Sequence, residues 1–319
     1  MITALKGTIP SVLLVRKGDE DEYQMLEQVT SRLQDLGIRT RLVWDGKPQL
    51  KHFLWSLTSG TETAVISFRP IHKFLPSWAK IFQQEKHNKI SEYENLKQAG
   101  IPVPNWKEIK PSDEIPDLSY FPDFVVVKPA NGACGALVRV MRRDHVRWQP
   151  LEVKHKRSEI DSIIVQEYIH TGPWPTSFRV ATAFGEPIHA WRLTADRSRE
   201  PFRGEEMNSD FFKGRSIVSS SKGCTYDREV PEDVLELSRR VHDATFQNIP
   251  LLSIDIIRDY RTGKLYVLEL NLCALNIVPT PAAGRHLREG FGFDPWLQFG
   301  GASAIARGIY RCIMKETEN

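Results

Sequence analysis

The sequence predicts a mixed α/β and α+β fold, in which a small parallel α/β domain precedes a larger region built from strand pairs and helices. Over residues 1–84, apolar runs alternate with helix-like stretches, which is the pattern of a parallel sheet. After them, strand-like runs follow one another across short turns that contain glycine. With 319 residues, the chain is long enough for more than one domain.

The first domain is expected to begin with the strand SVLLVRKG. The stretch DEDEYQMLEQVTSRLQDLG has apolar residues at helical spacing and a closing Gly37, so it predicts a helix. IRTRLVW predicts a second strand, QLKHFLWSLTSG a second helix, and TAVISF a third strand.

The middle of the chain predicts a helix, an extended exit and three strands. The helix within FQQEKHNKISEYENLKQAG ends at Gly100, and the IPVP that follows forces an extended conformation. Residues 107–122 are rich in Pro, Asp and Ser and are expected to form a surface connection. DFVVVKPANGACGALVRVM predicts a strand, a turn and a strand, and SIIVQEYI predicts another strand.

The remaining stretch predicts two strand pairs and two helices. SFRVATAFGEPIHAWRLTA is expected to turn at Gly185-Glu186-Pro187, and PEDVLELSRRVHDATFQNI is amphipathic. The hairpin SIDIIRDYRTGKLYVLELN follows, and ASAIARGIYRCIMKE is the last predicted helix.

Composition favours a cytoplasmic protein without a nucleic-acid or membrane partner. The net charge of +3 is too small for its length to indicate nucleic-acid binding. The apolar run SVLLV is too short for a signal core or a membrane span. The four cysteines have no metal-binding spacing, which indicates reduced thiols in a cytosolic protein.

Two carboxylates stand among apolar residues in the hairpin of residues 253–271. A three-residue loop centred on Thr262 places Asp255 and Glu269 opposite each other, with their β-carbons about 5 Å apart. Strand periodicity puts Asn271 on the same face as Glu269. Opposed like charges destabilise a sheet, so a cation between them is expected, and all-oxygen ligands suit Mg²⁺ or Mn²⁺. The alternative is that both carboxylates are merely solvated on an open sheet face.

Basic residues and glycines elsewhere suggest the phosphates that such a metal accompanies. Lys128 ends an apolar strand, and Gly132 and Gly135 in the next loop let backbone N–H groups approach an anion closely. Arg179 and Arg192 lie on apolar strands, where a guanidinium suggests an anion contact. For each of these residues, an ordinary turn or an exposed position remains the alternative.

Taken in order, these stretches resemble the ATP-grasp superfamily, in its glutamate-ligase-like and D-alanine–D-alanine-ligase-like branches. The residues that carry the resemblance are Asn88-Lys89 before AGIPVP, VVVKPANGACG, VQEYI, SFRV and the hairpin SIDIIRD…LYVLELN. The resemblance implies a pre-ATP-grasp α/β domain over residues 1–84 and a two-lobed ATP-grasp fold. Its small lobe would span residues 85–165 and its large lobe residues 166–319.

The resemblance also implies roles for individual residues. Lys89 and Lys128 would bind ATP phosphates under the loop that contains Gly132 and Gly135. Adenine would lie along the segment Gln166, Glu167, Tyr168 and Ile169. One or two Mg²⁺ (or Mn²⁺) ions would be held by Asp255, Glu269 and Asn271. Arg179 and Arg192 would stabilise the transferred phosphoryl group or the substrate carboxylate.

The implied activity is ATP-dependent joining of a carboxylate to an amine through an acyl phosphate, with an amino acid or peptide as substrate. Two alternatives remain, namely a phosphotransferase that acts on a hydroxyl and an ATP-binding protein without catalysis. Two departures from the family bear on the site. No acidic residue lies between Glu167 and Arg179, and LCALNIVP replaces the usual small-residue stretch after the hairpin. A homodimer is the commonest state of soluble enzymes and stays open.

Overall fold

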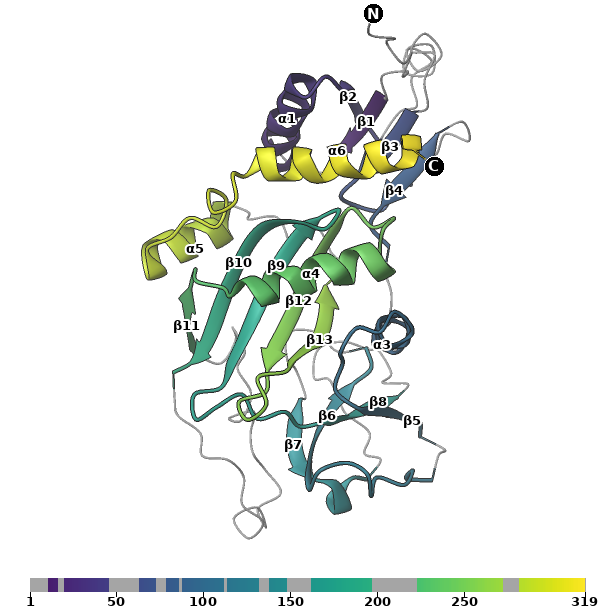
Figure 1. Cartoon of the computed structure of the whole chain (residues 1–319), viewed down its shortest axis with the longest axis vertical. Helices are drawn as coiled ribbons and strands as arrows, with labels where there is room; N and C mark the ends of the chain where they lie inside the picture. Colours follow the sequence, from purple (N-terminus) through teal and green to yellow (C-terminus); the bar gives the residue numbers. More distant parts are fainter. Residues whose placement is uncertain are drawn as a thin grey trace, which may run out of the picture.

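The computed structural model has three sheets connected by helices (Figure 1). It describes residues 11–16, 20–45, 63–72, 79–85, 88–111, 114–131, 138–147, 162–196, 223–271 and 281–318. The predicted helix over residues 49–60 lies outside these residues. Among the residues described, no helix has both the length and the apolar character needed to cross a membrane.

The N-terminal sheet is wholly parallel, as predicted, with strand order β2-β1-β3-β4. Its elements are β1 (Ser11–Arg16), α1 (Glu20–Asp35), β2 (Arg39–Trp44), β3 (Thr63–Ser67) and β4 (Lys80–Gln83). The sequence analysis missed β4, because KIFQ is only four residues long and runs into a polar stretch. The apolar residues at helical spacing in α1 are buried, namely Met25, Leu26, Val29 and Leu33.

The second sheet is antiparallel and has the order β5-β8-β6-β7. It contains β5 (Trp106–Ile109), β6 (Phe124–Pro129), β7 (Arg139–Arg142) and β8 (Ile163–Glu167), with a short 3₁₀ turn at Arg143–His145. Helix α3 (Lys89–Gln98) precedes it, and Gly100 has a φ of 68°, as its predicted position after the helix requires. Three of the four residues of β5, 107–109, lie in the stretch that was predicted to be a surface connection.

The third sheet is also antiparallel, with the order β11-β10-β9-β12-β13. Its strands are β9 (Thr176–Ala183), β10 (Glu186–Ala195), β11 (Cys224–Asp227), β12 (Leu251–Arg258) and β13 (Leu265–Asn271). Three helices accompany it, namely α4 (Glu232–Thr245), α5 (Pro281–Phe291) and α6 (Ala302–Glu318). The sequence analysis did not predict β11 or α5.

The turn between β9 and β10 differs from the prediction. It is formed by Phe184 and Gly185, with φ values of 47° and 79°, whereas Glu186 and Pro187 already belong to β10. Two consecutive positive φ values are the signature of a tight hairpin whose twist matches that of its strands. Phe184 accepts this conformation while its ring is buried edge-on against Phe82.

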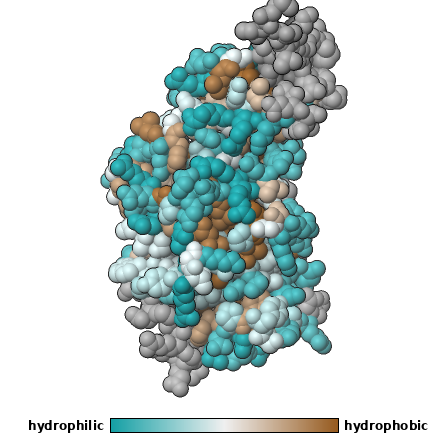
Figure 2. All heavy atoms as spheres, in the orientation of Figure 1, coloured by the Kyte–Doolittle hydropathy of each residue, from teal (hydrophilic) through white to brown (hydrophobic). Residues whose placement is uncertain are grey.

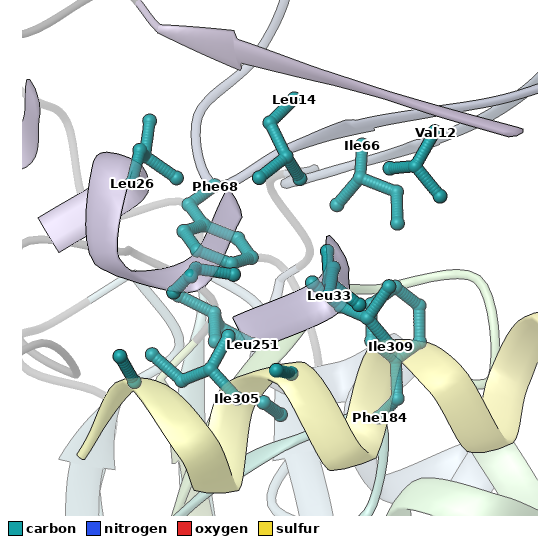
Figure 3. Packing of buried hydrophobic residues seen from close by; sticks show 14 of the residues in the cluster. Val12, Leu14, Leu26, Leu33, Ile66, Phe68, Phe184, Leu251, Ile305 and Ile309 are labelled. Carbon is teal, nitrogen blue, oxygen red and sulfur yellow. The ribbon is translucent and has the colours of Figure 1, made fainter. Parts of the chain in front are cut away.

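Helix α6 connects the N-terminal sheet to the five-stranded sheet. In Figure 1 it lies between α1 and the N-terminal strands on one side and the ends of β9 and β10 on the other. One hydrophobic cluster spans this junction, and ten of its side chains are labelled in Figure 3. Helix α4 covers one face of the five-stranded sheet. The face of the molecule shown in Figure 2 is largely hydrophilic, with hydrophobic atoms gathered near its middle.

Candidate functional site

The two hairpin carboxylates face each other, as the sequence predicted. Asp255 pairs with Glu269, and Ser253 pairs with Asn271, across β12 and β13. The route to this register differs from the expectation, because Leu268 is an extra residue that forms a bulge between the carboxylate pair and the turn. The turn is correspondingly longer, since the N–H of Asp259 already bonds the carbonyl of Lys264.

Asp255 is neutralised by Arg179 on the neighbouring strand. The register places Arg179 directly opposite Asp255, and its Nε and Nη2 donate to the two carboxylate oxygens at 2.6 and 2.7 Å. A two-pronged contact of this kind is the strongest geometry available to an ion pair. The negative charge of Asp255 accordingly raises the pKa of Arg179, so the guanidinium stays charged.

Glu269 is neutralised by Lys89 at the start of α3. The side chain of Asn88 caps this helix by accepting the N–H of Ser91 at 2.8 Å. Lys89 Nζ then donates to Glu269 Oε1 at 2.6 Å. The repulsion that predicted a cation between the carboxylates is therefore relieved, in this structure, by one basic side chain for each.

Lys128 lies beside this cluster at the end of β6. Its side chain is buried, and its Nζ donates to the hydroxyl of Tyr93 at 2.6 Å. That hydroxyl donates in turn to the carbonyl of Leu268, the bulge residue of β13. Burial lowers the pKa of Lys128 to about 8, although the negative charge of Glu269 opposes the shift.

The sequence analysis missed two residues of α3 that contact β13. The carboxyl of Glu92 is buried, and desolvation followed by the charge of Glu269 raises its pKa to about 8. Tyr93 provides the hydroxyl described above. Both lie one helical turn after Lys89, so helical spacing from a suspected phosphate lysine is the signal that could have found them.

The adenine segment that the resemblance implies follows β8. Gln166 shares a sheet face with Lys128, since Gln166 pairs with Val126 and Lys128 with Ile164. Gln166 is buried, and its Nε2 has no hydrogen-bond partner within the described chain. The carboxylate of Glu167 accepts the side-chain N–H of Asn105 at 2.9 Å. Tyr168 is packed against the apolar side chains of β6 and β7, and Ile169 is buried.

One predicted residue, Arg192, is not brought into this cluster. Arg192 pairs with Phe178, which lies in the core beneath α4, so it is on the opposite sheet face from Arg179. Its Nη2 bonds Asp227 at the sheet edge. The structure therefore does not bring Arg192 together with Arg179, because the residue that pairs with Arg179 is Trp191, the neighbour of Arg192. Gly132 and Gly135 lie outside the described residues.

The residues at the hairpin fit a hard divalent cation. Asp255 and Glu269 provide carboxylate oxygens, and Asn271, which lies on the same sheet face as Glu269, adds an amide oxygen. Oxygen donors of this kind are those that Mg²⁺ and Mn²⁺ prefer. In the described part of the chain, no three His, Cys, Asp or Glu side chains gather as a metal site.

Comparison with known proteins identifies a matching family and solved structures of similar fold. A family model described as an ATP-grasp domain matches residues 86–271. No curated protein sequence matches significantly. The solved ATP-grasp ligase PsnB, in complex with a minimal precursor, is similar in fold. It has 15% sequence identity, a TM-score of 0.50, and coverage of 94% of this chain and 99% of PsnB.

Two further solved structures give similar coverage. D-cycloserine synthetase DcsG has 15% identity and a TM-score of 0.49, with 95% of this chain and 99% of that chain covered. D-alanine–D-alanine ligase from Bacillus anthracis has 13% identity and a TM-score of 0.46, with 96% and 98% covered. At such identities the likeness concerns the fold.

Proposed function

This chain belongs to the ATP-grasp domain family, and from that premise we propose that it is an ATP- and Mg²⁺-dependent ligase that joins a carboxylate to an amine. The observation that carries the proposal is the pair of facing carboxylates, Asp255 and Glu269, each bonded to a basic side chain. Lys128 adds a third basic side chain beside them, and this one is buried. A cluster of this composition can hold both a metal ion and the phosphates of a nucleotide.

The proposed reaction requires little covalent chemistry from the protein. A substrate carboxylate oxygen attacks the γ-phosphorus of ATP, ADP leaves, and an acyl phosphate forms. The amine nitrogen then attacks the acyl carbon, phosphate leaves, and the amine loses a proton. Catalysis of phosphoryl transfer rests mainly on positioning and charge neutralisation, so no nucleophilic side chain is needed.

Each residue of the cluster has a part in this proposal. Lys89 and Lys128 would bind phosphate oxygens, and Arg179 would stabilise the transferred phosphoryl group or the substrate carboxylate. Asp255, Glu269 and Asn271 hold the divalent cation, which when bound neutralises charge on the phosphates. Gln166 and the segment Glu167 to Ile169 bind the adenine.

The wider setting is proposed on the same basis. The α/β domain covers residues 1–84, the small lobe residues 85–165 and the large lobe residues 166–319. The substrates are small carboxylates and amines, with amino acids and peptides foremost, and the protein acts in the cytoplasm without a nucleic-acid or membrane partner. A homodimer is the commonest assembly for such enzymes.

The decisive experiment is a screen for ADP release from Mg·ATP over pairs of amino acids and short peptides, with mass spectrometry of the product. We expect ADP and phosphate only when a carboxylate and an amine are both present, and a product lighter by one water than its two substrates. The double variant Asp255→Ala/Glu269→Ala is expected to lose turnover. The control Asp233→Ala removes an exposed carboxylate that pairs with Arg258 on the far side of the hairpin.

Three outcomes would contradict the proposal. Full turnover in the double variant would remove the hairpin from the mechanism. A stable phosphorylated product that forms without an amine would indicate a phosphotransferase. Mg·ATP binding without hydrolysis across a broad screen would indicate a binding protein.

A further inference from the structure

Tyr93 connects three separate elements beside the predicted phosphate lysine. Its hydroxyl accepts a hydrogen bond from Lys128 Nζ of β6 at 2.6 Å and donates one to the carbonyl of Leu268 in β13. Lys128 Nζ itself lies 3.5 Å from the same carbonyl. Both side chains are buried, with exposed fractions of 2% for Tyr93 and 7% for Lys128. Water therefore has little access to replace either bond.

The carbonyl that accepts this hydrogen bond belongs to Leu268, the bulge residue of the β12–β13 hairpin. Leu268 has no partner residue in β12 and directly precedes Glu269. The neighbouring residue of β13, Val267, donates its N–H to the carbonyl of Pro102, which follows α3 in the chain. Through the Tyr93 hydroxyl, the Lys128 ammonium is therefore connected to the backbone of Leu268, the residue that directly precedes Glu269.

The hydroxyl of Tyr93 is suited to a fixed role. Its ring packs against Trp106, with centroids 5.5 Å apart and planes tilted by 31°. Burial raises the pKa of Tyr93, so the hydroxyl keeps its proton and continues to donate to Leu268. A phenol has only two torsions to fix, whereas a lysine side chain loses much more freedom when it is held in one place.

A buried tyrosine with two hydrogen bonds is often just part of a core. Here, however, the group bonded to the hydroxyl is a buried ammonium, and a charged group bonded to a neutral partner gains more than two neutral groups do. Lys89 bonds Glu269, the residue next to the bulge. The two lysines are therefore positioned by two adjacent residues of β13, Lys89 directly by Glu269 and Lys128 through Tyr93 by Leu268.

We propose that Tyr93 is a positioning residue, which holds the Lys128 ammonium at the β13 bulge so that it meets the nucleotide phosphates in register with Glu269. This inference rests on the proposed function, because it assumes that Lys128 binds phosphate. In this proposal, nucleotide binding depends on the neutral hydroxyl of Tyr93, which does not itself contact the nucleotide.

The test is a double-mutant cycle read by calorimetric titration with the magnesium complex of a non-hydrolysable ATP analogue. Tyr93→Phe keeps the ring and removes the hydroxyl, and we expect the dissociation constant to rise about tenfold, the size of one hydrogen bond to a charged group. In a Lys128→Met background the same change is expected to alter affinity less than about twofold, since the group on which Tyr93 acts is gone. Tyr120→Phe, which removes an exposed hydroxyl from the same lobe, is the control and is expected to leave affinity unchanged.

The outcomes separate this inference from the proposed function. If the wild type does not bind the analogue, both fail. If it binds and Tyr93→Phe binds equally well, or weakens binding equally in both backgrounds, only the positioning role fails. Should Tyr93→Phe not fold, Tyr93→4-aminophenylalanine keeps the ring and places a para nitrogen that can still accept from Lys128 and donate to Leu268. It is expected to bind within about threefold of wild type, and an affinity as poor as that of Lys128→Met would overturn the proposal.

Discussion

Individual charges at the candidate site are arranged so that each carboxylate has its own basic partner. The side chains of Arg179 and Asp255 are 28% and 18% exposed, and those of Lys89 and Glu269 are 14% and 28% exposed. Partly buried charges of one sign would be costly, and pairing removes most of that cost. Each hairpin carboxylate is therefore charge-compensated by a basic side chain of its own.

The geometry of the Arg179 pair gives the first prediction. Arg179→Lys keeps the positive charge but loses the two parallel hydrogen bonds to Asp255, so we expect the free energy of unfolding to fall by about 1–2 kcal/mol. Denaturant unfolding measures this change. The matched control is Arg258→Lys, which breaks a similar two-pronged contact with the more exposed Asp233. It is expected to change stability by less than about 0.5 kcal/mol, and an equal loss in both variants would contradict the argument.

At the scale of single elements, the hairpin shows what a sequence can and cannot specify. The facing of Asp255 and Glu269 was predicted correctly from a turn centred on Thr262, although the turn is longer and the bulge at Leu268 compensates. A bulge has no residue requirement that distinguishes LYVLELN from a regular strand. The sheet face on which Arg192 lies was also not predictable, because it depends on a register that is set by the β9–β10 turn at Phe184 and Gly185.

Short elements such as β4 and β5 were missed because four residues carry too little periodicity.

Helix α4 provides a prediction about pH through its buried His242. Its Nε2 lies 2.8 Å from the carbonyl of Ile249, which can only accept, so that nitrogen carries the proton. Its Nδ1 then accepts from the hydroxyl of Thr182, also at 2.8 Å. Burial first, and the nearby Arg311 last, lower the pKa of His242 from 6.5 to about 3. The imidazole is therefore neutral in the folded protein at pH values where the unfolded chain would bind a proton.

The sign of the effect follows from this difference. Above pH 6.5 the full contribution of His242 to stability is present. Between pH 6.5 and 3 the unfolded state holds one more proton, so stability falls by about 1.4 kcal/mol for each unit that the pH drops. The variant His242→Gln is expected to be less stable at pH 7 but to lose stability less steeply on acidification. Parallel curves of unfolding free energy between pH 7 and 5 would show that His242 titrates normally.

On the scale of the whole molecule, α6 packs between the N-terminal sheet and the five-stranded sheet and joins them in one hydrophobic cluster. Ile305 and Ile309 of α6 contribute to the cluster that also contains residues of β1, β3 and α1. Gln84, just after β4, bonds both the N–H and the carbonyl of Leu251 at the start of β12. The sequence predicted α6 as a helix, but nothing in its own pattern indicates that a helix from the end of the chain packs against α1. Such long-range packing depends on the shapes of both surfaces, which a linear reading does not contain.

Gly308 is the residue that lets α6 approach the five-stranded sheet closely, and it provides the last prediction. A β-carbon at this position would lie 2.1 Å from the carbonyl oxygen of Ala183, a backbone atom that cannot rotate away. Gly308→Ala should therefore push α6 off the end of β9 and lower the free energy of unfolding by about 3 kcal/mol, at the upper end of overpacking effects. The control Gly290→Ala places a methyl group on α5 in open space, and it is expected to be neutral or to stabilise by up to about 1 kcal/mol.

Scanning calorimetry shows whether Gly308→Ala separates the unfolding of the two sheets or leaves it in one transition. Because one hydrophobic cluster spans both sheets, the wild type is expected to unfold the N-terminal domain and the large lobe in a single transition. If α6 is the connection between them, the variant should show two separate transitions, with the N-terminal domain unfolding first, since its four-stranded sheet shares its core with α6. A variant that keeps one transition at the wild-type temperature would mean that the contact between Gly308 and Ala183 does not hold the two parts together.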